Sequence, residues 1–551
     1  MAGVTLYAPG PGEEVRSTHV AQFVNLCSGA ANGGALVKLN DVSDSTSYSV
    51  IVGNQDTTNG YALKVQFGAV GSPTTLATFQ KSSSRIQSAN GSHYVDISNT
   101  GVTITGTLTI NTQTVGAGVN VFNVLDYGIQ TSTQAVEASA GTAVRAANNT
   151  ALNTLLTALR TAGGGVIEFP AHAEGRMYPF NAPITLTHAG AALTIGLQGK
   201  GYSSALQFYG LTATSHGLDF AGSSSSAWRQ SFVRDMVLVA DTSASSPTGG
   251  ALIRMKTVVG MELANLWLRH SYAGIHVGAV DNTGLNIPVQ VRMRNIDVDL
   301  HPTSGGIGLQ LYPAGGVWVS NSTFDGNVLA SVGMRATPVG NTIAPTAYNA
   351  IDSLWVDNCN FNGHAIGVRF GQSGQLSNVF ISRTHLDGVG QGATSGIAMQ
   401  IETSATAVVE NMQLTDMWLA TYPTTGVGYG LYVVGSTGTI RNVIVQGLYS
   451  TQALSAAVYV TGTGVTNLTL ANAFINGATA VNNNEIDIVG GTGITIIGNR
   501  VSGPGNSGYA IVAASGVANL VMTGNNGTGK ATGGTAMLGT SSSTRVLGAN
   551  I

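Results

Sequence analysis

The chain has 551 residues, of which 74 are glycine, with 43% hydrophobic and only 9% charged residues and a net charge of −3. One compact core rarely exceeds roughly 250–300 residues, so several domains or a stacked array are expected. The glycines follow no three-residue period, which excludes collagen, and the low charge with ample hydrophobicity excludes a disordered chain. Because the 23 basic residues are scattered, nucleic acid is not an expected partner.

Residues 1–20 carry two prolines and clustered charge, and are predicted to form an extended N-terminal arm. They lack the basic and apolar regions of a secretory signal. No apolar stretch approaches the ~18 residues of a membrane span, so no membrane insertion is expected. Cys27 and Cys359 lie in regions of different character and are expected to be free, buried thiols.

Residues 21–112 contain short runs that alternate apolar and polar side chains, such as YSVIVG, YALKVQF and HYVDIS. Alternation with a period of two indicates half-buried strands, so this region is predicted to be a β-rich head and neck domain. The run from Val102 to Ile110 is a candidate neck strand, and residues 113–121 are predicted to be a linker.

A helix is predicted next. Asn149 and Thr150 can cap a segment in which four leucines recur at helical spacing, and three consecutive glycines provide its stop. The leucines are Leu152, Leu155, Leu156 and Leu159. The strand VIEFP follows.

From about residue 230 to the C-terminus, a pattern of an apolar residue, any residue and an anchor residue, most often Asn, recurs every 25 to 37 residues. A period that varies in length but keeps its pattern predicts a solenoid whose turns differ in their loops. Asn, Asp and Gly suit the tight corners of such turns. The alternative is an ordinary β-sandwich with glycine-rich turns. The anchors are Asp235, Asn265, Asn295, Asn321, Asn358, Arg383, Asp416, Gly447, Asn472, Asn499 and Asn525.

The segments FNVLDYGIQ, LLTALRTAGGGVIEFP and QGKGYSSALQFYG resemble the start of the pectate-lyase-like right-handed parallel β-helix family. The resemblance implies an all-β fold, with residues 122–229 forming the first part and its capping helix, and 230–551 forming the repeats. This superfamily has many activities, so the likeness is specific for fold alone. The matching residues are Asp126, Tyr127, Gly128, Gly163 to Gly165, Phe169, Pro170, Gly199 and Gly201.

A β-rich region ahead of a β-helix resembles the layout of phage tailspike and tail-fibre proteins. That likeness implies a homotrimer in the virion tail, assembled in the host cytoplasm. It also implies that the N-terminal region binds other tail proteins and that the β-helix binds host surface polysaccharide. In the pectate-lyase-like β-helix family, an acidic stretch usually follows the segment that Asp126 to Gly128 match, and here it is replaced by QTSTQAVEAS, so only the architecture carries over.

Three aspartates, Asp299, Asp325 and Asp387, lie four residues after their anchors, and Asn362 holds this position on the turn between the last two. If the turns stack in register, Asp299 and Asp325 are about 5 Å apart, and Asp325 and Asp387 about 10 Å. Retaining glycosidases place two carboxyl groups about 5–5.5 Å apart and inverting ones about 6.5–9.5 Å, so both pairings are open. The three are the candidate catalytic residues; the alternative is that each only caps a turn.

Further candidates for substrate binding share positions relative to the anchors. Aromatic faces cover the C–H surface of sugars, and imidazoles can bind sugar hydroxyls. Because the histidines do not have metal-ligand spacing, neither a catalytic metal nor another cofactor is expected. These candidates are Asp297, Asp357, His301, His364, His385, Trp267 and Trp418.

The sequence therefore favours a tailspike or tail fibre that binds host polysaccharide and degrades it as a glycoside hydrolase. A fibre that binds glycan without cleaving it is the alternative. A polysaccharide lyase, with Arg383 as base beside Asp357 and Asp387, ranks below hydrolysis, and a bacterial surface adhesin is a further possibility.

Overall fold

The computed structural model describes seven strand segments of the N-terminal region, at 34–40, 47–52, 62–68, 74–80, 83–87, 94–98 and 101–105, and most of the chain from 120 onward. From there it describes residues 120–528 and 545–547 except 133–141, 173–175, 188–193, 213, 222–226, 242–248, 280–286, 303–304, 327–329, 338–349, 372, 405–406, 477–483 and 503–508. Two compact units, Met1–Ala117 and Gly118–Ile551, make up the chain.

The first unit contains a seven-stranded antiparallel meander in which each strand pairs with the next along the chain. The predicted arm, Cys27 and the last part of the candidate neck strand lie outside the described residues. The strands are β1 (Gly34–Asn40), β2 (Ser47–Val52), β3 (Ala62–Gly68), β4 (Thr74–Gln80), β5 (Ser83–Gln87), β6 (Tyr94–Ser98) and β7 (Gly101–Thr105).

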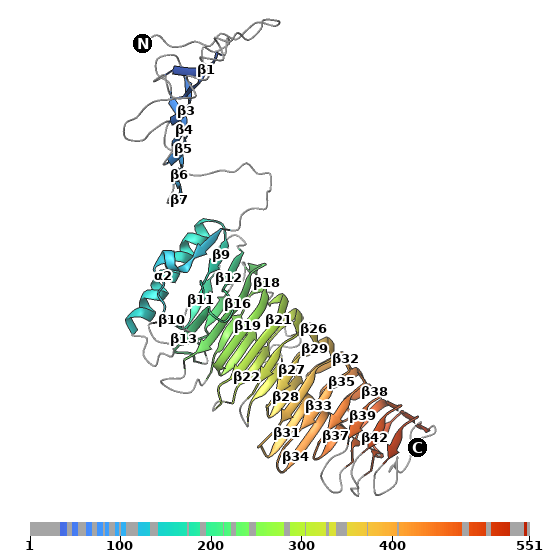
Figure 1. Ribbon diagram of the computed structural model, residues 1–551. Helices are drawn as coiled ribbons and strands as arrows, with labels where there is room; N and C mark the ends of the chain where they lie inside the picture. The colour runs from blue at the N-terminus through green and yellow to red at the C-terminus, as the bar shows by residue number, and fades with distance from the viewer. Residues whose placement is uncertain are drawn as a thin grey trace, which may run out of the picture. The chain divides into compact units, whose positions relative to one another are not determined.

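The second unit is a parallel β-helix, as predicted, in which every turn adds a strand to each of two long parallel sheets (Figure 1). The 28-stranded sheet bends at the anchor residues. We call its strands before the bend face 1, those after it face 2, and the 12-stranded sheet face 3. The long strands β16 (Phe232–Ala240), β19 (Glu262–Ser271) and β21 (Val289–Leu300) span faces 1 and 2.

Face 1 otherwise consists of β8 (Val121–Asn123), β9 (Gly165–Glu168), β12 (Ile195–Gln198), β15 (Trp228–Arg229), β18 (Val258–Val259), β23 (Ala314–Ser320), β26 (Ala350–Asp357), β29 (Gln375–Ser382), β32 (Val408–Thr415), β35 (Thr439–Gln446), β38 (Val465–Ala471), β41 (Gly491–Ile497), β44 (Val517–Ala518), β45 (Leu520–Thr523) and β47 (Arg545–Leu547). Face 2 adds β10 (Met177–Asn181), β13 (Ala205–Tyr209), β24 (Thr323–Asp325), β27 (Asn360–Asn362), β30 (His385–Val389), β33 (Trp418–Thr421), β36 (Tyr449–Thr451), β39 (Phe474–Asn476), β42 (Arg500–Ser502) and β46 (Asn526–Thr528).

Face 3 consists of β11 (Ile184–Thr187), β14 (Leu218–Ala221), β17 (Ala251–Met255), β20 (Ala273–Val277), β22 (Ile307–Leu311), β25 (Val332–Ala336), β28 (Ile366–Gly371), β31 (Ser395–Thr403), β34 (Val427–Gly435), β37 (Ala456–Thr461), β40 (Ile486–Ile488) and β43 (Ile511–Ala513). Alternate side chains of all three faces fill one continuous apolar interior.

The first turn of the coil is covered by α2 (Thr142–Thr161), which follows the short 3₁₀ helix η1 (Val124–Tyr127) (Figure 1). The four predicted leucines are buried, and Gly163 after the helix has a φ of 79°. The predicted cap is wrong, because the helix begins earlier. Asn149 lies inside it and makes two side-chain hydrogen bonds, of 2.8 and 2.9 Å, to the backbone of Asn181 in β10. This asparagine docks the helix on the coil.

The bend between faces 1 and 2 is made by anchors in the left-handed region, with φ near 50° from Asp235 through Asn472 except at Gly447, where it is 67°. Their amides bond from turn to turn: Asn265 donates to Asp235 at 2.7 Å, and Asn295 donates to Asn265 at 2.9 Å. Asn tolerates this conformation better than other non-glycine residues, and the stacked amides satisfy one another.

The last two anchors are displaced by one position from those that we predicted. Gly498 and Gly524 occupy the bend, with φ of 66° and 67°. Asn499 and Asn525 follow them and point into the interior, where Asn499 donates to Asn525 at 2.9 Å and each amide also donates to a backbone carbonyl. We assigned the corner to asparagine because most anchors are asparagine, but in these two turns the preceding glycine adopts the left-handed conformation.

In the described part of the chain, no helix is both long and apolar enough to cross a membrane. The one described cysteine, Cys359, is buried, and burial raises the pKa of its thiol to about 12.

We expect Asn295→Ala to lower the free energy of unfolding by about 1–2 kcal/mol, since it loses an amide hydrogen bond and strains a left-handed residue. Asn295→Gly should lose less, because glycine adopts this φ freely. Urea denaturation measures both variants. An alanine variant that unfolds at the wild-type urea concentration would contradict the role assigned to the anchor amides.

Candidate functional site

Face 2 presents two columns of outward side chains, at the second and fourth positions after each anchor. The third position points inward, as the stacked and fully buried Phe324 and Phe361 show, with ring centroids 4.9 Å apart. Since strands of one face pair in register, side chains at the same position lie on adjacent rungs about 4.8 Å apart. Positional equivalence in the sequence thus becomes proximity on this face.

The structure brings Asp299 and Asp325 together, because they are register partners in β21 and β24. Asp297 lies two residues before Asp299 on the same outward side. Elsewhere the 28-stranded sheet places opposite charges on neighbouring rungs, as in Arg294 with Glu262 and Arg441 with Glu410. Like charges directly opposite one another destabilise a sheet, so this acidic cluster differs from its surroundings.

Two carboxyl groups of this acidic cluster hold their protons more tightly than usual. Burial, followed by repulsion from Asp325 and Asp299, raises the pKa of Asp297. Burial and the Asp299 charge also raise the pKa of Asp325, against the opposing effect of Asn362, whose Nδ2 donates to Asp325 Oδ1 at 3.0 Å. A raised carboxyl pKa in an open site is what a general acid requires.

Cationic and imidazole groups lie on the other side of Asp299. Arg269 is its register partner in β19 and covers the ring of Trp267, with Cζ 4.2 Å from the centroid. His270 Nε2 is 4.0 Å from Asp299 Oδ2, and His301 is near enough to lower the pKa of His270, after burial and Arg269. Arg269 and His270 are site residues that we did not predict, although Arg269 shares the fourth position after its anchor.

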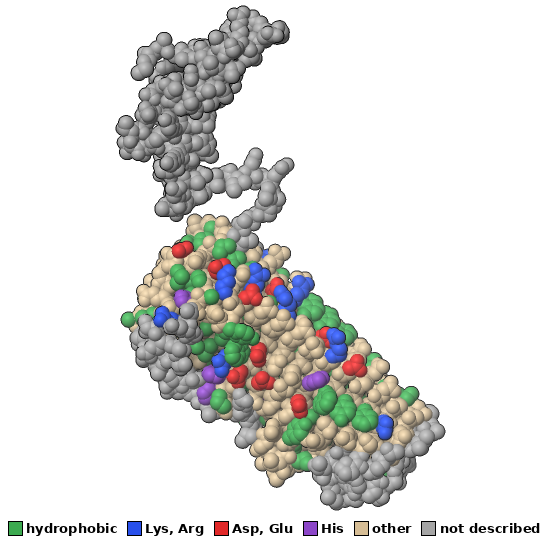
Figure 2. Space-filling view, viewed as in Figure 1, with side chains coloured by type: hydrophobic (Ala, Val, Ile, Leu, Met, Phe, Trp, Pro, Cys, Tyr) green, Lys and Arg blue, Asp and Glu red, His purple; other side chains and the backbone are tan. Residues whose placement is uncertain are grey.

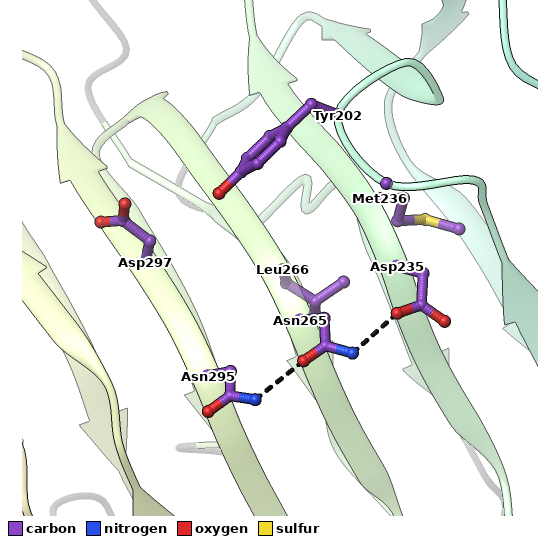
Figure 3. A pocket seen from close by; sticks show the side chains of 8 residues that line it. Tyr202, Asp235, Met236, Asn265, Leu266, Asn295 and Asp297 are labelled. Carbon is purple, nitrogen blue, oxygen red and sulfur yellow. Dashed lines mark hydrogen bonds between the residues drawn. The ribbon is translucent and has the colours of Figure 1, made fainter.

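A groove of roughly 210 Å³ adjoins the cluster on the N-terminal side. Figure 3 shows Tyr202 above it, Asp297 at one side, and the hydrogen-bonded amides of Asn265 and Asn295 along its floor. Tyr202 is 73% exposed and meets Trp267 edge to face at 5.2 Å. Tyr202 comes from a turn outside the repeat, so the anchor pattern gives no signal for it.

A second aromatic group lies on the C-terminal side. His385, Trp418, Tyr449 and Phe474 are successive register partners at the second position after the anchors, with centroids 4.7 to 5.6 Å apart. Trp418 is 41% exposed. Figure 2 shows acidic side chains beside hydrophobic and histidine side chains along this flank of the coil. The flank thus offers aromatic surface on both sides of the carboxylates.

Asp387 lies on the same column as Asp325 but two rungs away, because Asn362 stands between them. Its Oδ1 accepts from the amide of Gly388 at 2.8 Å, so it caps its own turn. The 37-residue spacing from Asn321 to Asn358 hides no additional turn, since β24 pairs directly with β27.

Two predicted substrate-binding residues are engaged elsewhere. Asp357 accepts from Arg383 Nε at 3.0 Å, from Arg383 Nη2 and from Ser382, and the Arg383 hydrogen bond lowers its pKa. His364 is only 1% exposed, and both its nitrogens are within 2.9 Å of Ser331 Oγ and the Phe324 carbonyl. His364 therefore cannot contact a surface ligand, because its position lies past the strand end, where the alternation no longer applies.

The guanidinium of Arg383, which would be the base in the lyase alternative, forms an ion pair with Asp357. This pairing disfavours Arg383 as a base. Among the described residues, no three His, Cys, Asp or Glu side chains are arranged to hold a metal ion.

No protein-family model and no curated protein matches the chain. Among solved structures, it is similar to a tailspike protein variant of E. coli bacteriophage HK620 in complex with pentasaccharide, at 12% identity and a TM-score of 0.49, covering 79% of this chain and 76% of that one. It is also similar to the Yersinia enterocolitica family 28 exopolygalacturonase, at 10% identity and a TM-score of 0.44, over 94% and 98% of the two chains. At such low identity, neither protein's activity transfers to this chain through the likeness.

We expect Asp325→Asn to stabilise the folded protein at pH 7 by less than about 1 kcal/mol, since it relieves like-charge repulsion on a half-exposed face. The folded-state pKa of Asp325 is raised, so its destabilising effect appears as pH rises through that pKa. The gain should therefore vanish below about pH 3, where Asp325 is protonated in both the folded and the unfolded protein.

Asp357→Asn is the matched control with the opposite sign. The pKa of Asp357 is lowered, so the ionised Asp357 stabilises the folded protein near neutrality, and this stabilisation disappears as pH falls through the lowered pKa. Asp357→Asn should therefore destabilise the protein at pH 7. Thermal unfolding between pH 2.5 and 8 measures both variants. If Asp325→Asn destabilised the protein at pH 7, Asp325 would belong to a stabilising network and not to a repulsive cluster.

Proposed function

We propose that this protein binds a polysaccharide along face 2 and cleaves it by hydrolysis. The supporting observation is the carboxylate pair Asp299 and Asp325 on adjacent rungs of an open face, between two groups of exposed aromatic side chains. Glycoside hydrolysis needs one protonated and one ionised carboxyl group. Repulsion between two close carboxylates raises the pKa of one of them, so that the two differ in protonation.

In this proposal Asp325 is the general acid that protonates the glycosidic oxygen. Its raised pKa keeps the proton available, and the Asn362 amide fixes the carboxyl group in place. Asp299, beside Arg269 and His270, is the carboxylate that attacks the anomeric carbon as the bond to the protonated glycosidic oxygen breaks. Water, giving its proton to Asp325, then cleaves the glycosyl ester and frees Asp299. Asp297 lines the groove and serves as a hydrogen-bonding partner for a sugar hydroxyl.

The pair spacing favours retention of configuration at the anomeric carbon. Adjacent rungs are about 4.8 Å apart, close to the roughly 5–5.5 Å of retaining enzymes. The pairing of Asp325 with Asp387 spans two rungs, and Asp387 is already used to cap its turn. We therefore assign chemistry to Asp299 and Asp325, and a binding or structural role to Asp387.

An extended sugar chain suits the remaining surface. The flat aromatic faces at Tyr202 and Trp418 can each cover the C–H side of a pyranose ring. The grooved and open form of the site, in contrast to a closed pocket, accommodates a polymer from either end.

We also propose that the protein is a virion tail component that assembles as a homotrimer through face 1. Supporting this, Trp318, Trp355 and Phe380 stack outward there, with ring centroids 4.8 and 5.9 Å apart, and Phe380 is 39% and Ile444 46% exposed. Because only 9% of the residues are charged, covering this exposed apolar face with another copy of the chain would protect it from aggregation. A stable monomer at micromolar concentration by sedimentation would contradict the trimer.

The cleavage proposal is tested by incubating the protein with bacterial capsule or lipopolysaccharide and measuring new reducing ends together with the absorbance of unsaturated uronates. Asp299→Asn and Asp325→Asn should each lower the cleavage rate roughly 10²-fold or more while glycan binding persists. Asp487→Asn is the control, because burial also raises the pKa of this carboxyl but it lies on face 3.

Reducing ends without uronate absorbance support hydrolysis, and both signals together would indicate a lyase. If the protein binds the glycan but produces neither signal, it is a glycan-binding protein without cleavage activity. If Asp299→Asn and Asp325→Asn both keep more than half of the wild-type rate, the assignment of these residues is wrong.

A further inference from the structure

Face 3 carries a polar column that neither the repeat nor the proposed site includes. Its members alternate with buried apolar residues, so their side chains point away from the apolar interior, and they are register partners from strand to strand. The column runs through Asp219, Arg254, His276, Gln310, Arg335, Arg369 and Gln400.

Charges at the two ends of this column are compensated. Arg254 donates to both carboxylate oxygens of Asp219, at 2.8 and 2.6 Å. Arg369 Nη2 lies 3.3 Å from Glu402 Oε2. His276 adds no positive charge near neutrality, because burial followed by His216 and the neighbouring arginines lowers its pKa to about 3.

Arg335, in the middle, faces no carboxylate among the described residues. Its Nε donates to the neutral amide oxygen of Gln310, and its register partner on the next rung is another cation, Arg369. Burial lowers the pKa of the Arg335 guanidinium. The nearby Tyr312 partly opposes this effect, and the charge of Arg369 adds to it. The Nε of Arg369 is buried without a hydrogen-bond partner among the described residues.

Within the described ranges, Arg369 is paired with Glu402 through Nη2 alone, and its Nε–H is unused. Arg335, one rung away at about 4.8 Å, has no carboxylate of its own there, and this arrangement of two guanidinium groups is unfavourable unless an anion joins the two. Guanidinium groups bind planar or tetrahedral oxyanions with paired hydrogen bonds. Tyr312 and Tyr272 both interact electrostatically with Arg335, and burial raises the pKa of Tyr312, so its hydroxyl stays a donor. Tyr312, Tyr272 and Arg369 can therefore each donate a hydrogen bond to an anion beside Arg335.

We propose that Arg335 and Arg369, with Tyr312, bind one oxyanion on the outer side of face 3. Its chemistry is that of a carboxylate, as in an acidic sugar, or of inorganic phosphate or sulfate. The site lies on a different sheet from the proposed catalytic pair and does not depend on the proposed function.

The test is titration calorimetry of the full chain with sodium phosphate, sodium sulfate and sodium glucuronate, each at the same ionic strength maintained with chloride. Saturable binding is expected for at least one oxyanion. Arg335→Gln should weaken it at least tenfold, and Arg335→Lys, which keeps the charge but not the paired donors, should give an intermediate loss. Arg294→Gln, which removes a paired arginine of face 1, should bind as the wild type does.

Tighter binding of glucuronate than of phosphate and sulfate assigns the site to an acidic sugar, and the reverse assigns it to an inorganic anion. A second measurement guards against misfolding. In chloride alone, Arg335→Gln should unfold at the wild-type temperature or above, because it removes like-charge repulsion. No saturable binding by the wild type, or unchanged binding by Arg335→Gln, would overturn the proposal.

Discussion

The in-register stacking of successive turns is the constraint on which the rest of this structure depends. Each rung donates and accepts backbone hydrogen bonds with the next, and the corner amides repeat the same relation, as in Asn295 with Asn265. A turn cannot shift by one residue without breaking its strand pairing and exposing its apolar side chains. Loops therefore vary in length while the faces keep their register.

One consequence is that each side chain's nearest neighbours are the equivalent residues one turn earlier and later. Rings stack on rings, as Trp318 on Trp355 with planes 1° apart, and opposite charges pair, as Arg441 with Glu410. Against this background, a run of like charges costs stability in every turn. The acidic cluster on face 2 and Arg335, which has Arg369 and no carboxylate as its register partner on face 3, depart from this pattern, and both of our functional proposals start from them.

The anchor period and the alternation after each anchor are local properties, so the β-helix, the face 2 columns and the partnership of Asp299 with Asp325 could be predicted from the sequence. Positions beyond the strand ends could not, because loop geometry decides them. His364 turns into the interior for this reason. Glycine and asparagine compete for the left-handed corner, which explains the displacement at Asn499. Tyr202 reaches the site from outside the repeat and leaves no periodic signal.

A second series of left-handed asparagines within face 1 was also missed. Asn411, Asn442 and Asn467 each have φ near 55° and bond from rung to rung, although at longer distances of 3.0 to 3.4 Å. These left-handed residues lie inside strands whose apolar pattern continues on both sides, so the sequence pattern does not indicate them. In the structure they appear as residues omitted from the strand pairing, as Asn411 and Asn442 are between β32 and β35. The backbone bends at more places than the anchor pattern indicates.

The central claim, that adjacent rungs place two carboxyl groups for glycan hydrolysis, has a direct stereochemical test. Proton NMR of the first-formed reducing end, recorded before mutarotation, reports whether the anomeric configuration of the cleaved bond is kept. The Asp299 and Asp325 pair predicts retention. An inverted product would contradict this account and assign the chemistry to carboxyl groups farther apart, such as Asp325 and Asp387.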